Sequence, residues 1–119
     1  MVRDFIARLW GSVAEVEGVE MRDGIVRRTL VYGAALMLVH WTIREGTVFG
    51  AHTHAFEQAG FLLKGRMRMI IDGKASELTP GSSYLVPTGV EHDAVAEEDL
   101  EILDVFAHPR EEYLPQAPP

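Results

Sequence analysis

The chain has 119 residues, of which 47% are hydrophobic, and this suits a single domain with a real core. It contains no cysteine, which excludes disulfides and thiolate metal sites, and its net charge of −7 disfavours nucleic acid and anionic membranes as partners. The longest apolar run is too short to span a bilayer and no signal peptide is recognisable, so we expect a cytoplasmic protein.

The first 24 residues differ in pattern from the rest of the chain. Five apolar residues near the start fall at helical spacing: Val2, Phe5, Ile6, Leu9 and Trp10. Gly11 follows as a stop signal, so we expect a short amphipathic N-terminal helix, with a mobile tail as the alternative. We divide the chain into this helix and its lead-in (1–24), a β-rich barrel (25–108) and a Pro-rich C-terminal tail (109–119).

Short β-rich segments follow residue 24, with turn signals every eight to twelve residues, as is typical of a sandwich or barrel. The expected strands are 25–32, 34–44, 58–64, 66–71, 74–78, 83–86, 92–96 and 100–106. Asp-Gly pairs at Asp23-Gly24 and Asp72-Gly73 are typical hairpin turns. The pattern therefore predicts an all-β fold of antiparallel strands.

One expected strand is apolar on both faces. In Ala34–Ile43 residues of both parities are mostly apolar, whereas a strand with one solvated face should alternate. We therefore expect both faces to be covered, one by the core and the other by a second copy in a homodimer or by the N-terminal helix. His40 in this strand is interpreted as a hydrogen-bonded core histidine, with a role in a pocket as the alternative.

Two histidines one residue apart suggest a metal site. His52, His54 and Gln58 have the same parity, so in an extended strand their side chains point to one face. His92 lies downstream after a second glycine- and proline-rich turn. Imidazole is the commonest metal ligand near neutral pH, so we expect these four residues to bind a divalent metal; ordinary core histidines are the alternative.

The last expected strand carries one carboxylate on an apolar face. Asp104 alternates with Leu100, Ile102 and Phe106, and a buried carboxylate tends to have a raised pKa that suits a general acid or base. Arg110 follows closely, where its guanidinium could bind a substrate carboxylate. A salt bridge between Asp104 and Arg110, or a turn-capping role for Asp104, remains the alternative.

These histidine blocks resemble the two motifs of the cupin superfamily. The first motif, G-x5-H-x-H-x(3,4)-E-x6-G, is matched by Gly46, His52, His54, Gln58 and Gly65. The second, G-x5-P-x-G-x2-H-x3-N, is matched by Gly81, Pro87, Gly89 and His92. The chain departs from the pattern at two places, with glutamine at the glutamate position and Ala96 at the asparagine position. The resemblance implies an RmlC-like jelly roll, an antiparallel double-stranded β-helix with the metal site inside the barrel.

The ending narrows this resemblance to small cupins of the KdgF type. Leu103-Asp104-Val105-Phe106, followed by Arg110-Glu111-Glu112-Tyr113-Leu114, is similar to their D-V-F-x-P-P-R-E-D-Y-L ending. Those proteins convert ring-form 4,5-unsaturated uronates of pectin and alginate breakdown to open-chain keto sugars. The resemblance implies metal ligands His52, His54, Gln58 and His92, and an active site lined by Asp104, Phe106 and Arg110.

We therefore expect a metal-dependent enzyme of carbohydrate metabolism that acts on a small, anionic, oxygenated metabolite. The alternatives are an iron-dependent dioxygenase and a ligand-binding cupin without turnover. Nickel, zinc, manganese and iron all accept three imidazoles and an oxygen, so the metal identity stays open. The expected partners are a small-molecule substrate and a second copy of the chain, without nucleic acid or membrane.

Overall fold

The computed structural model describes residues 7–114, and its regular secondary structure is almost entirely antiparallel strands. The bounds are Val19–Arg22 (β1), Ile25–Tyr32 (β2), Met37–Ile43 (β3), Gln58–Lys64 (β4), Met67–Ile71 (β5), Lys74–Leu78 (β6), Ser83–Val86 (β7), His92–Ala96 (β8) and Leu100–Phe106 (β9), with a 3-10 helix at Glu111–Tyr113 (η1). The predicted all-β antiparallel class is confirmed. In this part of the chain, no helix has the length and apolar character that crossing a membrane requires.

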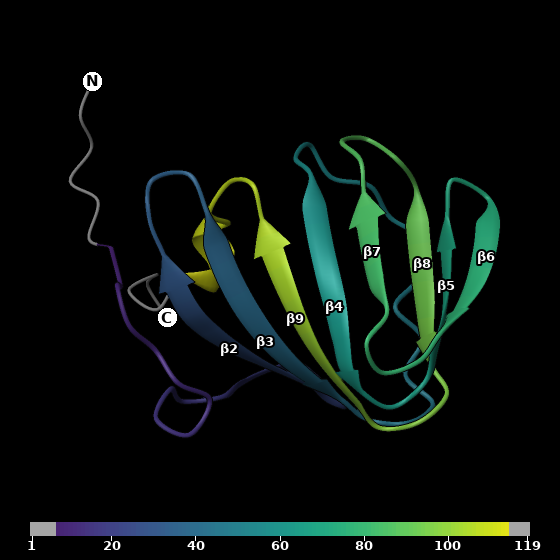
Figure 1. Cartoon of the computed structure of the whole chain (residues 1–119), viewed down its shortest axis with the longest axis horizontal. Coiled ribbons are helices and arrows are strands. Elements are labelled where there is room, and N and C mark those ends of the chain that lie inside the picture. The colour runs from purple at the N-terminus through teal and green to yellow at the C-terminus, as the bar shows by residue number, and fades with distance from the viewer. Residues whose placement is uncertain (1–6, 115–119) are drawn as a thin grey trace.

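The strands form two sheets that enclose one core. The larger has the order β1-β2-β3-β9-β4-β7 and the smaller the order β6-β5-β8, with all pairs antiparallel (Figure 1). Inward-facing side chains alternate along β3 and β9, so that Met37 and Val39 are buried together with Ile102 and Phe106. This alternation places one set of side chains from β3 and β9 on the inner face of the larger sheet, where the cavity lies.

Two predictions about element bounds need correction. Residues 34–36 are not part of β3, because Gly33 N–H bonds to the Leu36 carbonyl and closes a turn. β1 was not predicted, because the pattern over residues 12–24 is weak, with acidic residues and two glycines, and all four residues of the strand are exposed. The tight β5–β6 turn at Asp72-Gly73 is confirmed, with positive φ at both residues.

The predicted N-terminal helix lies mainly outside the described residues. Of its described part, residues 7–10 are not helical, and Arg8 instead forms an isolated antiparallel bridge with Tyr32 at the end of β2. The chain then runs along the edge of β2, where a Cβ added to Gly11 would lie 2.4 Å from the Leu30 carbonyl oxygen. This non-helical segment therefore lies along that edge of β2.

His40 lies on the outer face of β3 and is 2% exposed, so burial within the chain itself is as predicted. The expected hydrogen bond is not formed: Nε2 is 3.6 Å from a Glu101 carboxylate oxygen, and Nδ1 has no acceptor among residues 7–114.

The outer face of β9, β4 and β7 differs from that of β3, because it exposes apolar side chains. These are Phe61, Leu63, Leu85 and Val105, each at least 38% exposed.

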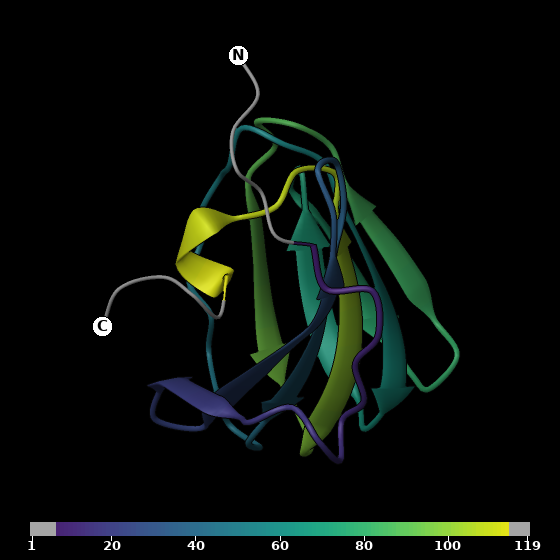
Figure 2. The same ribbon diagram turned by 90° about the vertical axis from the view of Figure 1, so that its left-hand side faces the viewer.

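The C-terminal segment folds back against the larger sheet. Thr29 donates its hydroxyl to the Tyr113 carbonyl at 2.6 Å, and Arg27 donates to the Glu112 carbonyl at 3.1 Å. Figure 2 shows η1 in yellow beside the strands. These bonds hold Arg110, which directly precedes η1, at the edge of the cavity.

Candidate metal centre and active site

Backbone pairing brings two of the histidines together. His52 and His92 form an antiparallel bridge in which each backbone N–H bonds to the other's carbonyl at 3.0 Å. The segment that carries His52 runs beside β8 but is not a regular strand, because Gly50 has φ +86°. The equal-parity argument for an extended strand is therefore only partly right, and the cross-strand bridge contributes the rest.

All three imidazole rings are held by a hydrogen bond at Nδ1, which leaves the Nε2 lone pair free in each. The Nδ1 atoms of His52, His54 and His92 donate to the carbonyls of Gly50, Phe56 and Val90 at 2.9, 2.8 and 3.0 Å. A carbonyl can only accept, so each neutral ring keeps its Nε2 lone pair free. Possible ligand atoms of the three residues lie within 4.8 Å of one another. Bonds of this kind orient the imidazoles of metal sites.

Burial also favours the metal-binding form of one ring. It lowers the pKa of His92, and the neighbouring His52 and His54 lower this pKa further. A lowered pKa keeps the imidazole neutral near pH 7, the form that coordinates metals.

Gln58 completes the donor set at the start of β4. Its Oε1 lies 2.8 Å from His54 Nε2. With Nδ1 donating to a carbonyl, both of these atoms are acceptors, and this proximity is favourable only if a proton or a cation lies between them. Two ligands at about 2.1 Å and a right angle around a metal lie about 3.0 Å apart. The donor set therefore fits a divalent metal with three imidazoles and one amide oxygen.

Asp104 faces the same cavity from β9 and is held by a distant side chain. Tyr84 on β7 donates its hydroxyl to Asp104 Oδ1 at 2.6 Å. Gly60 of β4 pairs with both residues and lies between them. A Cβ at this position would lie 2.0 Å from Tyr84 Cζ and 2.5 Å from Asp104 Oδ1, so only glycine leaves room for the contact.

The surroundings of Asp104 change its proton affinity. Burial raises the pKa of this carboxyl to about 6, although the Tyr84 hydroxyl and the neighbouring Gln58 and Trp41 side chains favour the charged form and lower the pKa. Burial also raises the pKa of Tyr84 well above its ordinary value, so Tyr84 remains a donor. A carboxyl with this pKa can exchange protons near neutral pH.

Arg110 is surrounded by aromatic rings and is not paired with Asp104. Its guanidinium carbon is 5.3, 5.8 and 4.7 Å from the ring centres of Phe56, Phe106 and Tyr113. It donates to the Tyr113 hydroxyl at 3.2 Å and to the Glu112 carboxylate at 2.6 Å. The alternative of an Asp104–Arg110 salt bridge is therefore wrong, and the guanidinium keeps donors on the cavity side.

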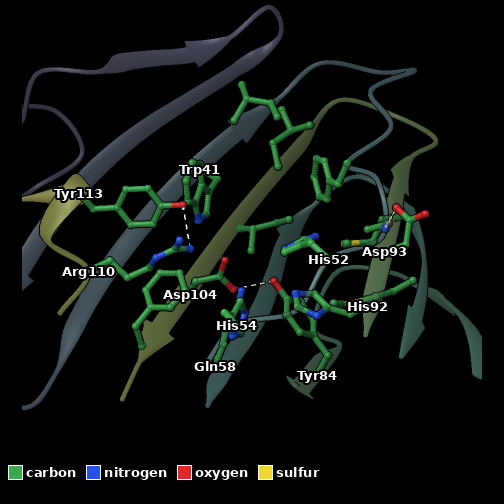
Figure 3. Close-up of a pocket in the computed structure, with 18 of the residues that line it drawn as sticks. Trp41, His52, His54, Gln58, Tyr84, His92, Asp93, Asp104, Arg110 and Tyr113 are labelled. Carbon is green, nitrogen blue, oxygen red and sulfur yellow. Dashed lines mark hydrogen bonds between the residues drawn. The ribbon is translucent and has the colours of Figure 1, made fainter. Parts of the chain in front are cut away.

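One cavity of about 230 Å³ brings all the predicted residues together (Figure 3). His52, His54, Gln58, His92, Asp104, Phe106 and Arg110 all line it. Ligand pockets usually start near 300 Å³, so this one suits a small molecule. Among the further lining residues that sequence reasoning missed are Trp41, Tyr84 and Tyr113. Gly60 was a usable signal, because a glycine inside a strand often marks a close approach.

Comparisons with known proteins show the family of this chain. The chain matches the cupin domain model over residues 39–106. It is 27% identical to pectin degradation protein KdgF of Dickeya dadantii (strain 3937), over 80% of this chain and 88% of that protein. The crystal structure of an RmlC-like cupin from Shewanella frigidimarina is similar, with a TM-score of 0.86 and 26% identity over 90% of this chain and 96% of that one. The structure of KdgF from a Halomonas species gives a TM-score of 0.84 and 27% identity over 88% and 97%. The chain belongs to the cupin family.

Proposed function

We propose that this cupin is a metal-dependent enzyme that converts ring-form unsaturated uronates to open-chain keto sugars. The observation that carries the proposal is the presence, in one small cavity, of a three-histidine cluster and a buried carboxyl whose pKa is raised to about 6. The similarity to pectin degradation protein KdgF supports the substrate class.

The residues divide into a metal-binding end and a proton-transfer end. His52, His54, Gln58 and His92 would hold the metal, which when bound would act as a Lewis acid on sugar oxygens. Arg110 would bind the substrate carboxylate, since its guanidinium donors match carboxylate geometry. The aromatic side chains of Phe106 and Tyr113 would exclude water around that ion pair.

Asp104 would move the proton. Ring opening takes the proton from the C1 hydroxyl, breaks the bond between C1 and the ring oxygen and returns a proton to that oxygen, which leaves an aldehyde at C1 and an enol at C5. Tautomerisation then adds a proton to C4 and removes the enol proton to give the C5 ketone. The reaction is an isomerisation without net proton change, so one carboxylate can take a proton and return it.

The test combines metal analysis with a ketonisation assay. Untagged protein is analysed for metals, and the decay of the conjugated C4=C5 absorbance is followed with an unsaturated uronate, against the uncatalysed rate. We expect about one divalent ion per chain and a rate that falls to the uncatalysed value after chelation. Substoichiometric metal in fully active protein would contradict the metal-dependent mechanism.

The same preparation separates the alternatives. Oxygen consumption that requires ferrous iron would replace the isomerase with a dioxygenase. Retention of an unaltered uronate, with no product by mass spectrometry, would replace it with a binding protein. Either result leaves the metal site intact and removes the proposed reaction.

We also infer that two copies of the chain associate through the outer face of β9, β4 and β7. Phe61, Leu63, Leu85 and Val105 expose apolar surface there, on neighbouring strands of an otherwise acidic protein. Light scattering at micromolar concentration should give the mass of a dimer, and Phe61→Asp should give a monomer. A monomer mass for the unmodified chain would rule the association out.

A further inference from the structure

Trp41 places an unpaired donor in the cavity. It lies on β3 opposite Ile102 of β9, its side chain is 9% exposed, and it lines the cavity. Its indole Nε1 is fully buried and has no hydrogen-bond acceptor among residues 7–114. A buried donor without a partner destabilises the folded state. An unpaired N–H beside a cavity therefore indicates an acceptor that arrives with a ligand.

The donor lies beside Arg110, one of the two arginines that line the cavity. The Trp41 and Tyr113 rings meet edge to face at 5.5 Å, and Arg110 donates to the Tyr113 hydroxyl at 3.2 Å. Figure 3 shows the indole nitrogen on the side of the ring that faces Arg110 and Tyr113. A neutral N–H and a guanidinium thus border the same space, and their shared complement is an anion with more than one acceptor oxygen.

Asp104 does not fulfil this role in the structure. It is close enough to Trp41 for the indole to favour its charged form, but its hydrogen bond at Oδ1 comes from Tyr84. The indole N–H is left without an acceptor in bonding geometry. A carboxylate bound at Arg110 would supply one.

We propose that the Trp41 indole N–H donates to a carboxylate oxygen of the bound sugar acid, beside Arg110, and that Trp41 thereby determines specificity for uronates over neutral sugars. The identity of the ligand rests on the proposed function, whereas the donor and its position do not. Hydrogen bonds to charged groups contribute about 1.5–3 kcal/mol, so one such bond corresponds to a tenfold or greater difference in affinity.

The direct test observes the indole proton. The chain has two tryptophans, and Trp10 is 83% exposed outside the cavity, so Trp10→Phe leaves one indole resonance to follow. Zinc-loaded Trp10→Phe protein is titrated by proton–nitrogen NMR with galacturonate, a saturated uronate that cannot ketonise, and with galactose as the neutral counterpart. We expect galacturonate to move the Trp41 indole proton downfield and slow its exchange, and galactose to leave it unchanged. The proposal is wrong if galacturonate leaves the resonance in place or if galactose moves it equally.

A kinetic test uses Trp41→Phe, which keeps an aromatic ring and removes the donor. KM for an unsaturated uronate should rise about tenfold or more while kcat changes much less, because Asp104 keeps its bond from Tyr84. Trp10→Phe is the matched control and should leave both constants unchanged. If kcat falls by as large a factor as KM rises, or if affinity falls equally for all sugars, Trp41 has a packing role and the proposal is contradicted. A lower melting temperature as the only change would mean the same.

The two proposals can fail separately. A galacturonate-dependent indole shift without ketonisation would keep the anion site and remove the reaction. Ketonisation with an unmoved indole would keep the reaction and remove the role of Trp41. An indole resonance that moves in ligand-free Asp104→Asn but not with galacturonate would make Asp104 the acceptor and overturn the inference.

Discussion

The two ends of the cavity are constructed in different ways. At the histidine end, each ring is oriented by a carbonyl only two residues away along the chain, at Gly50, Phe56 or Val90. At the carboxyl end, Asp104 is held by Tyr84, which is 20 residues away and two strands across the sheet. The first arrangement depends on local sequence and the second on strand register, so the two ends should respond differently to substitution.

The largest effect should follow removal of one histidine. His92→Ala removes a candidate ligand, and we expect metal affinity to fall by more than the roughly 10–100-fold typical of changes to the groups that orient ligands. His40→Gln is the matched control, because His40 is buried on the opposite face of the larger sheet. Elemental analysis after dialysis measures both. Full metal occupancy in His92→Ala would place the metal elsewhere.

Substitution at the other end should separate chemistry from metal binding. Asp104→Asn should keep metal and fold but lose roughly 10²–10⁴-fold in kcat, the range for a general acid or base. Glu101→Gln, a change on the same strand but the outer face, should be neutral. Unchanged turnover in Asp104→Asn would remove this carboxyl from the mechanism.

The buried carboxyl should also make stability depend on pH. The pKa of Asp104 is about 6 in the folded chain and 3.8 as the ordinary value, so between these values the folded state holds a proton that the unfolded state has released. The free energy of unfolding should therefore fall as pH rises from 4 to 6, by about 3 kcal/mol in total. Denaturant unfolding of metal-free protein at several pH values measures the free energy of unfolding. Subtracting the values for Asp104→Asn separates the contribution of Asp104 from that of His92. A pH-independent difference between the two proteins would contradict the raised pKa.

The smallest effect should come from the hydroxyl that holds the carboxyl. Tyr84→Phe keeps the ring but removes the bond to Asp104, and we expect about a tenfold loss in kcat with little change in KM. Gly60→Ala should give a similar loss, because its methyl group would displace the Tyr84 ring. Gly33→Ala is the control, since a Cβ at Gly33 would have no neighbour within 4 Å. Wild-type kcat in Tyr84→Phe would show that ring packing alone holds Asp104.

The sequence was informative wherever a short pattern determines the structure. Alternation and Asp-Gly turns predicted β2 and β4–β9 within a residue, because most of these strands bury one face against the core, whereas β6 is marked mainly by the turns at its ends. The His52–His54 spacing, with its second block at His92, predicted the cluster that the structure brings together. The inward face of β9 predicted the burial of Asp104.

The remaining features depend on contacts that no local pattern records. Trp41 lies in a strand that is mostly apolar on both faces, so no pattern in the sequence indicated that its indole N–H lacks a partner. Tyr84 reaches Asp104 only because β4 separates β7 from β9 and carries a glycine at the crossing. Arg110 was expected near a carboxylate, but its partner Glu112 and its aromatic neighbours come from the fold of the C-terminal segment.

Gly60 offers a way to sort related chains from their sequences alone. Many chains can share a histidine spacing, and that spacing says nothing about which reaction occurs beside the metal. A side chain larger than hydrogen at this position is incompatible with the Tyr84–Asp104 bond. A glycine here, with tyrosine and aspartate at the paired positions, therefore marks the chains able to carry a tethered carboxyl, and any other residue marks chains whose chemistry must be organised differently.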